Sequence, residues 1–247
     1  MRAATKKIWA LHLVANAAVV AGAYLWLGIG DASALQLAAT ALFGVLLVAF
    51  TVWLHGAVFA HFREPDLPLS GVFRTALRHL PPLVVVAVVA AALYWLLEWL
   101  LGRAYSPASN TASWLTLHLH RPVRPALILS IVTLKVRVME WWVVPVLLLP
   151  LVAGIAGNGW RGIARAPFAC LRTWTFWIGC PLLLLLALYV PGRLIRWVPY
   201  EGGLGLEMTS FVLRWLIAWL LFVTAWFAVV ALACGRRLWG QRAAEQS

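Results

Sequence analysis

Acidic residues are scarce in this chain of 247 residues, which has eight Asp and Glu against twenty Lys and Arg. Aspartate occurs only at Asp31 and Asp66, both in segments that we expect to be loops. The chain also lacks HExxH, GxSxG and paired acidic metal motifs. These absences argue against an enzyme; the catalytic alternative left open is intramembrane chemistry by Glu98 or Glu140 with a histidine.

Cysteine is also rare, and Cys170, Cys180 and Cys234 show neither CxxC nor Cys/His spacing. We therefore expect buried thiols rather than a metal site or a disulfide framework. Charged residues make up only 11% of the chain, whereas hydrophobic residues make up 64%. Soluble domains have about 25% and 45–50% respectively, so this composition predicts a polytopic membrane protein.

The positive charge is distributed in a way that favours lipid over nucleic acid. The net charge is +12, but the basic residues form short clusters between long apolar runs instead of following one amphipathic face. Anionic lipid headgroups are therefore the expected counter-charge. We predict the bilayer and anionic lipids as partners, with protein subunits as further candidates, and no nucleic acid and no cofactor.

Six segments are long and apolar enough to cross a bilayer, which takes about 20 residues. They predict an all-α, polytopic membrane helix bundle that forms a single domain over residues 1–247, with short amphipathic surface helices. The first apolar run exceeds the core of a signal peptide, so we expect an uncleaved span. The predicted spans are residues 8–28, 35–60, 82–101, 140–157, 174–191 and 210–234.

The distribution of cations predicts the orientation. If the N-terminus lies inside, twelve of the twenty Lys and Arg fall at cytoplasmic ends. The positive-inside rule then places both termini in the cytoplasm, and we expect a bacterial cytoplasmic (inner) membrane. Tryptophans at both predicted ends of the spans support the boundaries but do not distinguish the two sides.

Two segments between spans resemble each other: "SGVFRTALRHLPPLVVV" and "RGIARAPFACLRTWTFWIGCPLLLLL". Both carry a small residue, Leu and Arg before an apolar run, although such short matches also arise by chance. Each is predicted to form an amphipathic surface helix, the first with an apolar stripe of Phe73, Ala76, Leu77 and Leu80. Their cations are candidate contacts for lipid headgroups: Arg74, Arg78, Arg161, Arg165 and Arg172.

This layout resembles bacterial six-helix membrane families with a surface helix between spans, such as the membrane domain found beside glycerophosphodiester phosphodiesterases. The resemblance covers about residues 60 to 190 and rests on the layout and the small-Leu-Arg step. It implies a membrane helix bundle and transfers no catalytic residue.

Charged side chains interrupt the run "ILSIVTLKVRVMEWWVVPVLLLP" at residues 128–150. A helix from Pro125 to Gly157 would be about 50 Å long, so its first half would project beyond the hydrocarbon core or lie tilted in the interface. Lys135 and Arg137 can then reach headgroups, while Glu140 can pair with Arg137. A more specific interpretation is that four charged residues lie at one membrane depth and form a buried cluster of ion pairs: Glu98, Arg137, Glu140 and Arg214.

Three roles stay open for these four residues. They could lock helices together, line a ligand or ion pocket that opens to the outside, or make no contact between spans. Elsewhere in the spans, His12, Asn16 and His55 are lone polar residues, for which hydrogen bonding between helices is the usual role.

The exposed segment 102–139 is the largest candidate docking surface, and we expect it to lie flat on the outer face. If "WLTLHLH" is extended, His118 and His120 project from one face and are weak metal candidates, although no third ligand is evident. The glycine-rich "AGIAGNGWRG" lacks the ending of a phosphate loop. Small residues at Ala153 and Gly157 favour close helix approach, while Gly159 and Gly162 allow a turn.

These observations favour a non-catalytic multi-pass membrane protein that acts as a complex subunit, scaffold or lipid-interacting component. The alternative is a transporter or permease for a small solute or lipid that uses the outer-leaflet charged cluster. Pro145, Pro150 and Pro181 could interrupt spans as transporters require, but the first half of the chain has no matching pair.

Overall fold

The computed structural model describes residues 3–30, 32–164, 166, 168–197 and 203–235. These residues are largely helical and contain no strand. Six helical segments are long and apolar enough to cross a membrane, which confirms the predicted all-α bundle of six spans. The segments are Ala3–Leu27, Ala34–Arg63, Leu80–Gly102, Pro125–Gly162, Trp174–Arg196 and Leu204–Ala233.

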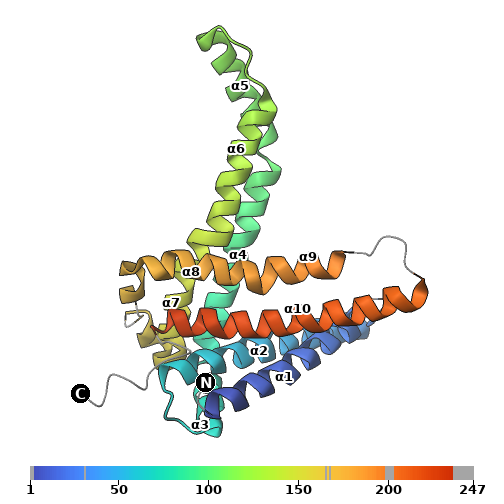
Figure 1. The fold of residues 1–247 in the computed structure, drawn as a ribbon, viewed down its shortest axis with the longest axis vertical. Coiled ribbons are helices and arrows are strands. Elements are labelled where there is room, and N and C mark those ends of the chain that lie inside the picture. Colours follow the sequence, from blue (N-terminus) through green and yellow to red (C-terminus); the bar gives the residue numbers. More distant parts are fainter. Residues whose placement is uncertain (1–2, 31, 165, 167, 198–202, 236–247) are drawn as a thin grey trace.

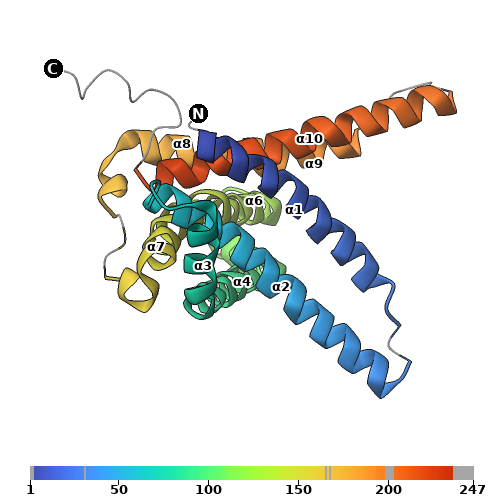
Figure 2. The ribbon, with the colours of Figure 1, turned by 90° about the horizontal axis from the view of Figure 1, so that it is seen from below.

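The spans form three antiparallel hairpins, here called arms, that splay from a common base (Figures 1 and 2). The first arm pairs α1 (Ala3–Leu27) with α2 (Ala34–Arg63). The second pairs α4 (Leu80–Gly102) and α5 (Tyr105–Leu119) with α6 (Pro125–Val138). The third pairs α8 (Trp174–Leu184) and α9 (Val190–Arg196) with α10 (Leu204–Ala233).

Short irregular turns lie within two of these spans. The π-helical turn η1 (Met139–Val143) joins α6 to α7 (Val144–Asn158), and the π-helical turn η4 (Leu185–Tyr189) joins α8 to α9. A π-helical turn inserts a residue into the helical ladder and often accompanies a functional position. Here, η1 holds Glu140 and η4 faces α10.

The arms converge at a hub, defined by the buried core residues of 54–62, 144–156 and 223–234 with Ile8 and Phe176. Alanine is frequent in the hub, and Ala57, Ala153 and Ala233 are fully buried. Small side chains let membrane helices approach closely, where dispersion contacts replace the hydrophobic effect that is missing in lipid. The distal halves of the arms carry many exposed Leu and Val side chains, and buried small residues such as Ala108 and Ala112 are fewer there.

A tight turn closes the hub after α7. Gly159 has a φ of +58°, and the chain then enters the 3-10 turn η2 (Gly159–Gly162). A Cβ atom on Gly154 would overlap the carbonyl oxygen of Gly162, and one on Gly162 would overlap the backbone of Gly154. The predicted turn at Gly159 and Gly162 is confirmed. Of the residues predicted to allow close helix approach, Ala153 is fully buried, and Gly154 adds a close contact with the turn.

The first predicted surface helix is present as α3 (Leu69–Arg78). Its buried residues are Val72 and Ala76, while Arg74 and Arg78 are exposed. Of the predicted stripe, Ala76 is buried, Phe73 and Leu80 are half-buried, and Leu77 is 56% exposed. The indole N–H of Trp53 donates a hydrogen bond of 2.9 Å to the carbonyl oxygen of Phe73 and ties α3 to α2.

The second predicted surface helix is wrong in the described residues. The chain there forms the 3-10 turns η2 and η3 (Phe168–Arg172) in place of an amphipathic α-helix. The glycines that permit the tight turn also weaken helix formation, and the sequence places Pro167, which lacks an amide hydrogen, directly before η3. The two similar sequences therefore do not share one conformation.

The segment 102–139 neither lies flat nor is extended. It forms most of a helical hairpin in which α5 packs against α6 and the tip projects away from the other two arms (Figure 1). Ala108 and Ala112, one turn apart, are the buried residues of α5. This spacing of small residues selects a helix over the strand that the alternation in "WLTLHLH" suggested. The long helix begins at Pro125 as predicted and runs for 38 residues.

Candidate functional site

Polar side chains from α1 and α2 face one another along the first arm. Near the N-terminal end of α1, the Thr5 hydroxyl lies 3.1 Å from Nε2 of His61. Further along, the imidazole rings of His12 and His55 meet edge to face, with their centroids 4.7 Å apart. The predicted role of hydrogen bonding between helices holds for the Thr5–His61 pair, which the sequence analysis missed. His12 and His55 make a ring contact instead.

Aromatic residues of α10 surround the His12–His55 pair. Phe227 packs edge to face on His12 at 5.4 Å between centroids, and Trp226 packs on His55 at 5.2 Å. Both ring nitrogens of His12, Nδ1 of His55 and Nε1 of Trp226 are buried without a hydrogen-bond partner among the described residues. Because buried polar atoms are normally paired, this concentration of unpaired atoms marks a site.

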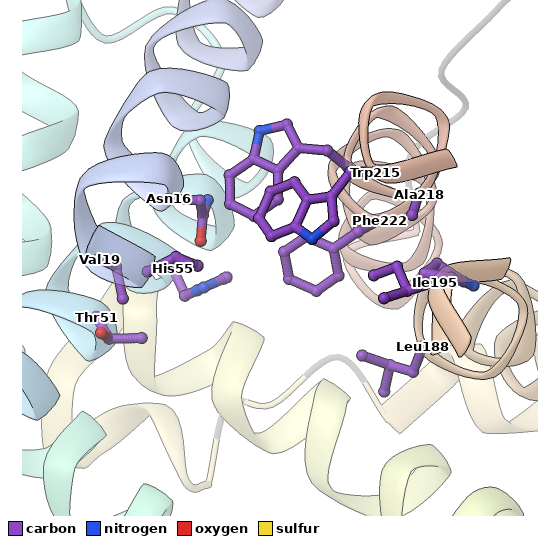
Figure 3. A pocket seen from close by; sticks show the side chains of 13 residues that line it. Asn16, Val19, Thr51, His55, Leu188, Ile195, Trp215, Ala218 and Phe222 are labelled. Carbon is purple, nitrogen blue, oxygen red and sulfur yellow. The ribbon is translucent and has the colours of Figure 1, made fainter. Parts of the chain in front are cut away.

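A cavity of about 400 Å³ lies beside His55, between the first and third arms (Figure 3). Asn16, Thr51 and His55 form its polar side, and Leu188, Ile195 and Phe222 belong to its apolar sides. The cavity is partly open at its margin.

A second cavity of about 340 Å³ lies between α2, α4, α7 and α10. The two cavities share Thr51, His55, Leu188 and Phe222 in their walls. His55 therefore stands where spaces between all three arms meet. Neither cavity is lined by a charged side chain from the described part of the chain.

Some polar groups at the cavity already have partners. The Thr51 hydroxyl donates to the carbonyl oxygen of Leu47 at 2.8 Å, and the Asn16 amide donates to that of His12 at 2.8 Å. The indole of Trp219 donates to the carbonyl oxygen of Leu13 at 3.3 Å and joins α10 to α1. The arrangement offers hydrogen bonds to a bound molecule at one point of an otherwise apolar space.

Three of the four charged residues predicted to cluster are in contact. Nη1 of Arg137 lies 2.5 Å from Oε1 of Glu98 and 2.6 Å from Oε2 of Glu140. The Glu140 side chain is only 4% exposed, whereas that of Glu98 is 54% exposed. Tyr94 adds a hydrogen bond of 2.8 Å from its hydroxyl to the carbonyl oxygen of Glu140. The Glu98–Arg137 pair joins α4 to α6, and the Tyr94 hydrogen bond joins α4 to η1. The cluster therefore locks the two helices of the second arm together.

Arg214 does not belong to this cluster, which corrects the four-residue interpretation. It lies on α10, and its guanidinium donates to the carbonyl oxygens of Leu194 at 3.5 Å and Ile195 at 3.4 Å. It also lies 5.5 Å from the ring centroid of Trp197. Arg214 therefore satisfies carbonyls at the C-terminal end of α9. Similar depth did not bring it near Glu98, because the arms splay apart.

The other candidate residues lie outside the hub core. Arg74, Arg78, Arg161 and Arg172 are exposed, while Arg165 lies outside the described residues. His118 stacks on Trp114 at 4.0 Å, and both His118 and His120 are exposed near the tip of the second arm. No group of three or more metal-ligating side chains gathers in the described ranges.

The cysteines lie in or beside the hub. Cys180 and Cys234 are buried, and Cys170 in η3 is half-buried. Partial burial raises the pKa of the Cys170 thiol, which keeps it protonated and weakly nucleophilic at neutral pH.

No family model matches the chain, and searches of curated proteins and of solved structures also found no match. The resemblance to six-helix membrane families therefore stays a prediction.

Proposed function

We propose that this protein is a non-catalytic, lipid-interacting membrane component that holds lipid chains between its arms, as a subunit or scaffold. The observation that carries the proposal is the pair of cavities that meet at His55 between the three arms. Their volumes lie in the range of about 300–1,000 Å³ that is typical of small-ligand sites. Their mostly apolar walls suit hydrocarbon chains.

The splayed arms give lipid a route to these cavities. The distal halves of the arms expose large apolar side chains, among them Val45, Val89 and Leu216. Such surfaces are covered by acyl chains when the spans lie in a bilayer. A chain held in either cavity meets no charged side chain of the described residues, so its binding there requires no desolvation of a charged group.

The hub end is the proposed cytoplasmic side of a bacterial inner membrane. The exposed cations Arg74 and Arg78 on α3, with Arg161 and Arg172 after α7, lie on segments at this end. They are proposed to contact anionic headgroups, each contributing about 1 kcal/mol near such a surface. This arrangement supports lipid interaction at the membrane surface as well as between the arms.

The alternative transporter function has no specific support in the geometry. It depended on a cluster that included Arg214, and Arg214 lies in the third arm, away from the ion pairs of the second. Those pairs fasten α4 to α6, and their residues line neither of the two cavities described above.

Native mass spectrometry of protein gently extracted from its source membrane tests the proposal. We expect the wild-type protein to retain lipid, and Ala90→Leu, which fills the second cavity, to retain much less. Ala91→Leu is the matched control, because Ala91 is the exposed neighbour on the same helix. Equal retention by both variants, or no retained lipid in any of them, would contradict the proposal. A stoichiometric protein partner in the same spectra would identify the complex that the subunit serves.

A further inference from the structure

We infer that the cavity beside His55 selects an amphiphile with a long apolar chain and an uncharged head that carries a hydroxyl or carbonyl oxygen. This inference rests on the proposed lipid-binding function and names the class of lipid. Its basis is the meeting of three polar side chains, Asn16, Thr51 and His55, at one point of an apolar space that contains no charged side chain from the described residues (Figure 3).

The three polar side chains provide both donors and acceptors. Nδ1 of His55 is buried and has no hydrogen-bond partner among the described residues, and a neutral imidazole offers one N–H donor and one acceptor. Asn16 uses its amide N–H for the His12 carbonyl, so its carbonyl oxygen is left as an acceptor. The Thr51 hydroxyl donates its hydrogen bond to the carbonyl oxygen of Leu47, and its oxygen still has lone pairs to accept one. A hydroxyl, which both donates and accepts, matches this set, and a carbonyl can accept from His55.

The depth of the site excludes a charged head. On α2, the first Lys or Arg towards the hub end is Arg63, eight residues from His55 and therefore about 12 Å away along the helix axis. On α1, Lys7 precedes Asn16 by nine residues, a similar distance. On α10, Arg214 directly precedes the wall residue Trp215, but its guanidinium donates to the carbonyl oxygens of Leu194 and Ile195. A phosphate beside His55 would have to take Arg214 away from these carbonyls or be desolvated without a counter-charge, and both are costly at membrane depth. An uncharged oxygen needs only the hydrogen bonds that the site provides.

The remaining walls define the place of the chain. Leu188, Ile195 and Phe222 face the polar side of the first cavity, and Trp215 stacks on Trp219 at 5.5 Å to form a flat aromatic wall. The second cavity adjoins the same side chains at His55, so the end of a chain longer than the first cavity would reach it by passing between these shared side chains.

Two kinds of membrane molecule carry this chemistry. A diacylglycerol has one hydroxyl and two acyl chains, whereas a prenylated quinone or a polyprenol has a ring carbonyl or a hydroxyl and one branched chain. Both present a neutral oxygen at the end of a long apolar body. The geometry fixes this shared chemistry, and the choice between the sources is a matter for experiment.

The experiment uses the full chain in nanodiscs of phosphatidylcholine and native mass spectrometry after ejection from the disc. The probes are a diacylglycerol, a short-chain prenylated quinone, and a phosphatidic acid with the acyl chains of the diacylglycerol. We expect at least one neutral probe to be retained at one per protein and the phosphatidic acid at least tenfold less. Preference for the diacylglycerol or the quinone identifies the source.

Variants locate the bound probe. His55→Phe should lower retention of the neutral probe at least tenfold, and His118→Phe, the same exchange at the exposed tip of the second arm, should leave it unchanged. Asn16→Leu tests the site from α1 if His55→Phe fails to fold, as judged by thermal melting and size-exclusion behaviour. The inference would be overturned if neither site variant lowered retention of the neutral probe, or if phosphatidic acid were retained as well as the neutral probe. Lipid binding in general would be unaffected by either result. Retention of no probe and no native lipid would overturn the proposed function as well.

Discussion

Arg137 and Glu140 lie three residues apart on the long helix of the second arm, with Nη1 and Oε2 separated by 2.6 Å. The same nitrogen atom contacts Glu98 of α4 at 2.5 Å. Glu140 is buried and Glu98 is exposed, so the two carboxylates depend on Arg137 to different degrees. The charged residues inside an apolar run thus fasten the two helices of one arm.

This asymmetry predicts unequal effects of substitution on stability. Arg137→Gln leaves the Glu140 carboxylate buried without its cation and should lower the free energy of unfolding by about 2–3 kcal/mol. Glu98→Gln leaves the Arg137–Glu140 pair intact and should cost less than Arg137→Gln. Thermal unfolding in detergent, followed by circular dichroism, measures both.

The double variant Arg137→Gln with Glu140→Gln is the control for this pair. Because it removes the unpaired buried charge, it should recover most of the stability that Arg137→Gln loses. Equal melting temperatures for Arg137→Gln and Glu98→Gln would show that burial of Glu140 does not govern the pair.

The backbone contact between Gly154 and Gly162 predicts a strict requirement for glycine. Gly162→Ala would place a methyl group into the backbone of Gly154 and should prevent accumulation of folded protein, because overpacking against backbone cannot relax cheaply. Gly102→Ala, at a helical glycine with open space around its Cβ position, should be neutral or stabilising by up to about 1 kcal/mol. Fluorescence-detected size-exclusion chromatography compares the two, and a monodisperse Gly162→Ala protein at wild-type yield would refute the requirement.

His12 and His61 should respond in opposite directions when replaced by leucine. His12 is 1% exposed, and neither of its ring nitrogens has a hydrogen-bond partner among the described residues, so His12→Leu should raise the melting temperature. His61→Leu removes the hydrogen bond to Thr5 and should lower it, by the equivalent of about 1 kcal/mol. If His12→Leu proved strongly destabilising, the ring would have to be paired in the membrane.

Cysteine labelling tests the proposed orientation. In a background where the three native cysteines are replaced by alanine, Ser113→Cys at the exposed face of α5 should react with a membrane-impermeant maleimide in intact cells. Ser70→Cys on α3 should react only after permeabilisation. The reverse pattern would place the hub outside, and labelling of both from outside would break the six-span topology.

Much of the architecture followed from the sequence. Each membrane-spanning helix satisfies its own backbone hydrogen bonds and can be recognised from its length and hydropathy. The six spans, the helix start at Pro125, the turn at Gly159 and the surface helix α3 depend on such local signals. The pairing of Arg137 with Glu140 was also predictable, because residues three apart share a helical face.

Contacts between distant segments were decided by the tertiary structure. Arg214 was expected at the depth of Glu98 but lies in another arm, because no local pattern indicates the direction in which the arms splay. The same holds for His12 and His55, which read as separate polar residues until the pairing of α1 with α2 set their rings 4.7 Å apart. The sequence by itself determined the helices, because their hydrogen bonds are internal. The tertiary structure alone decided the cavity at His55, because it arises from the relative positions of three arms that are far apart along the chain.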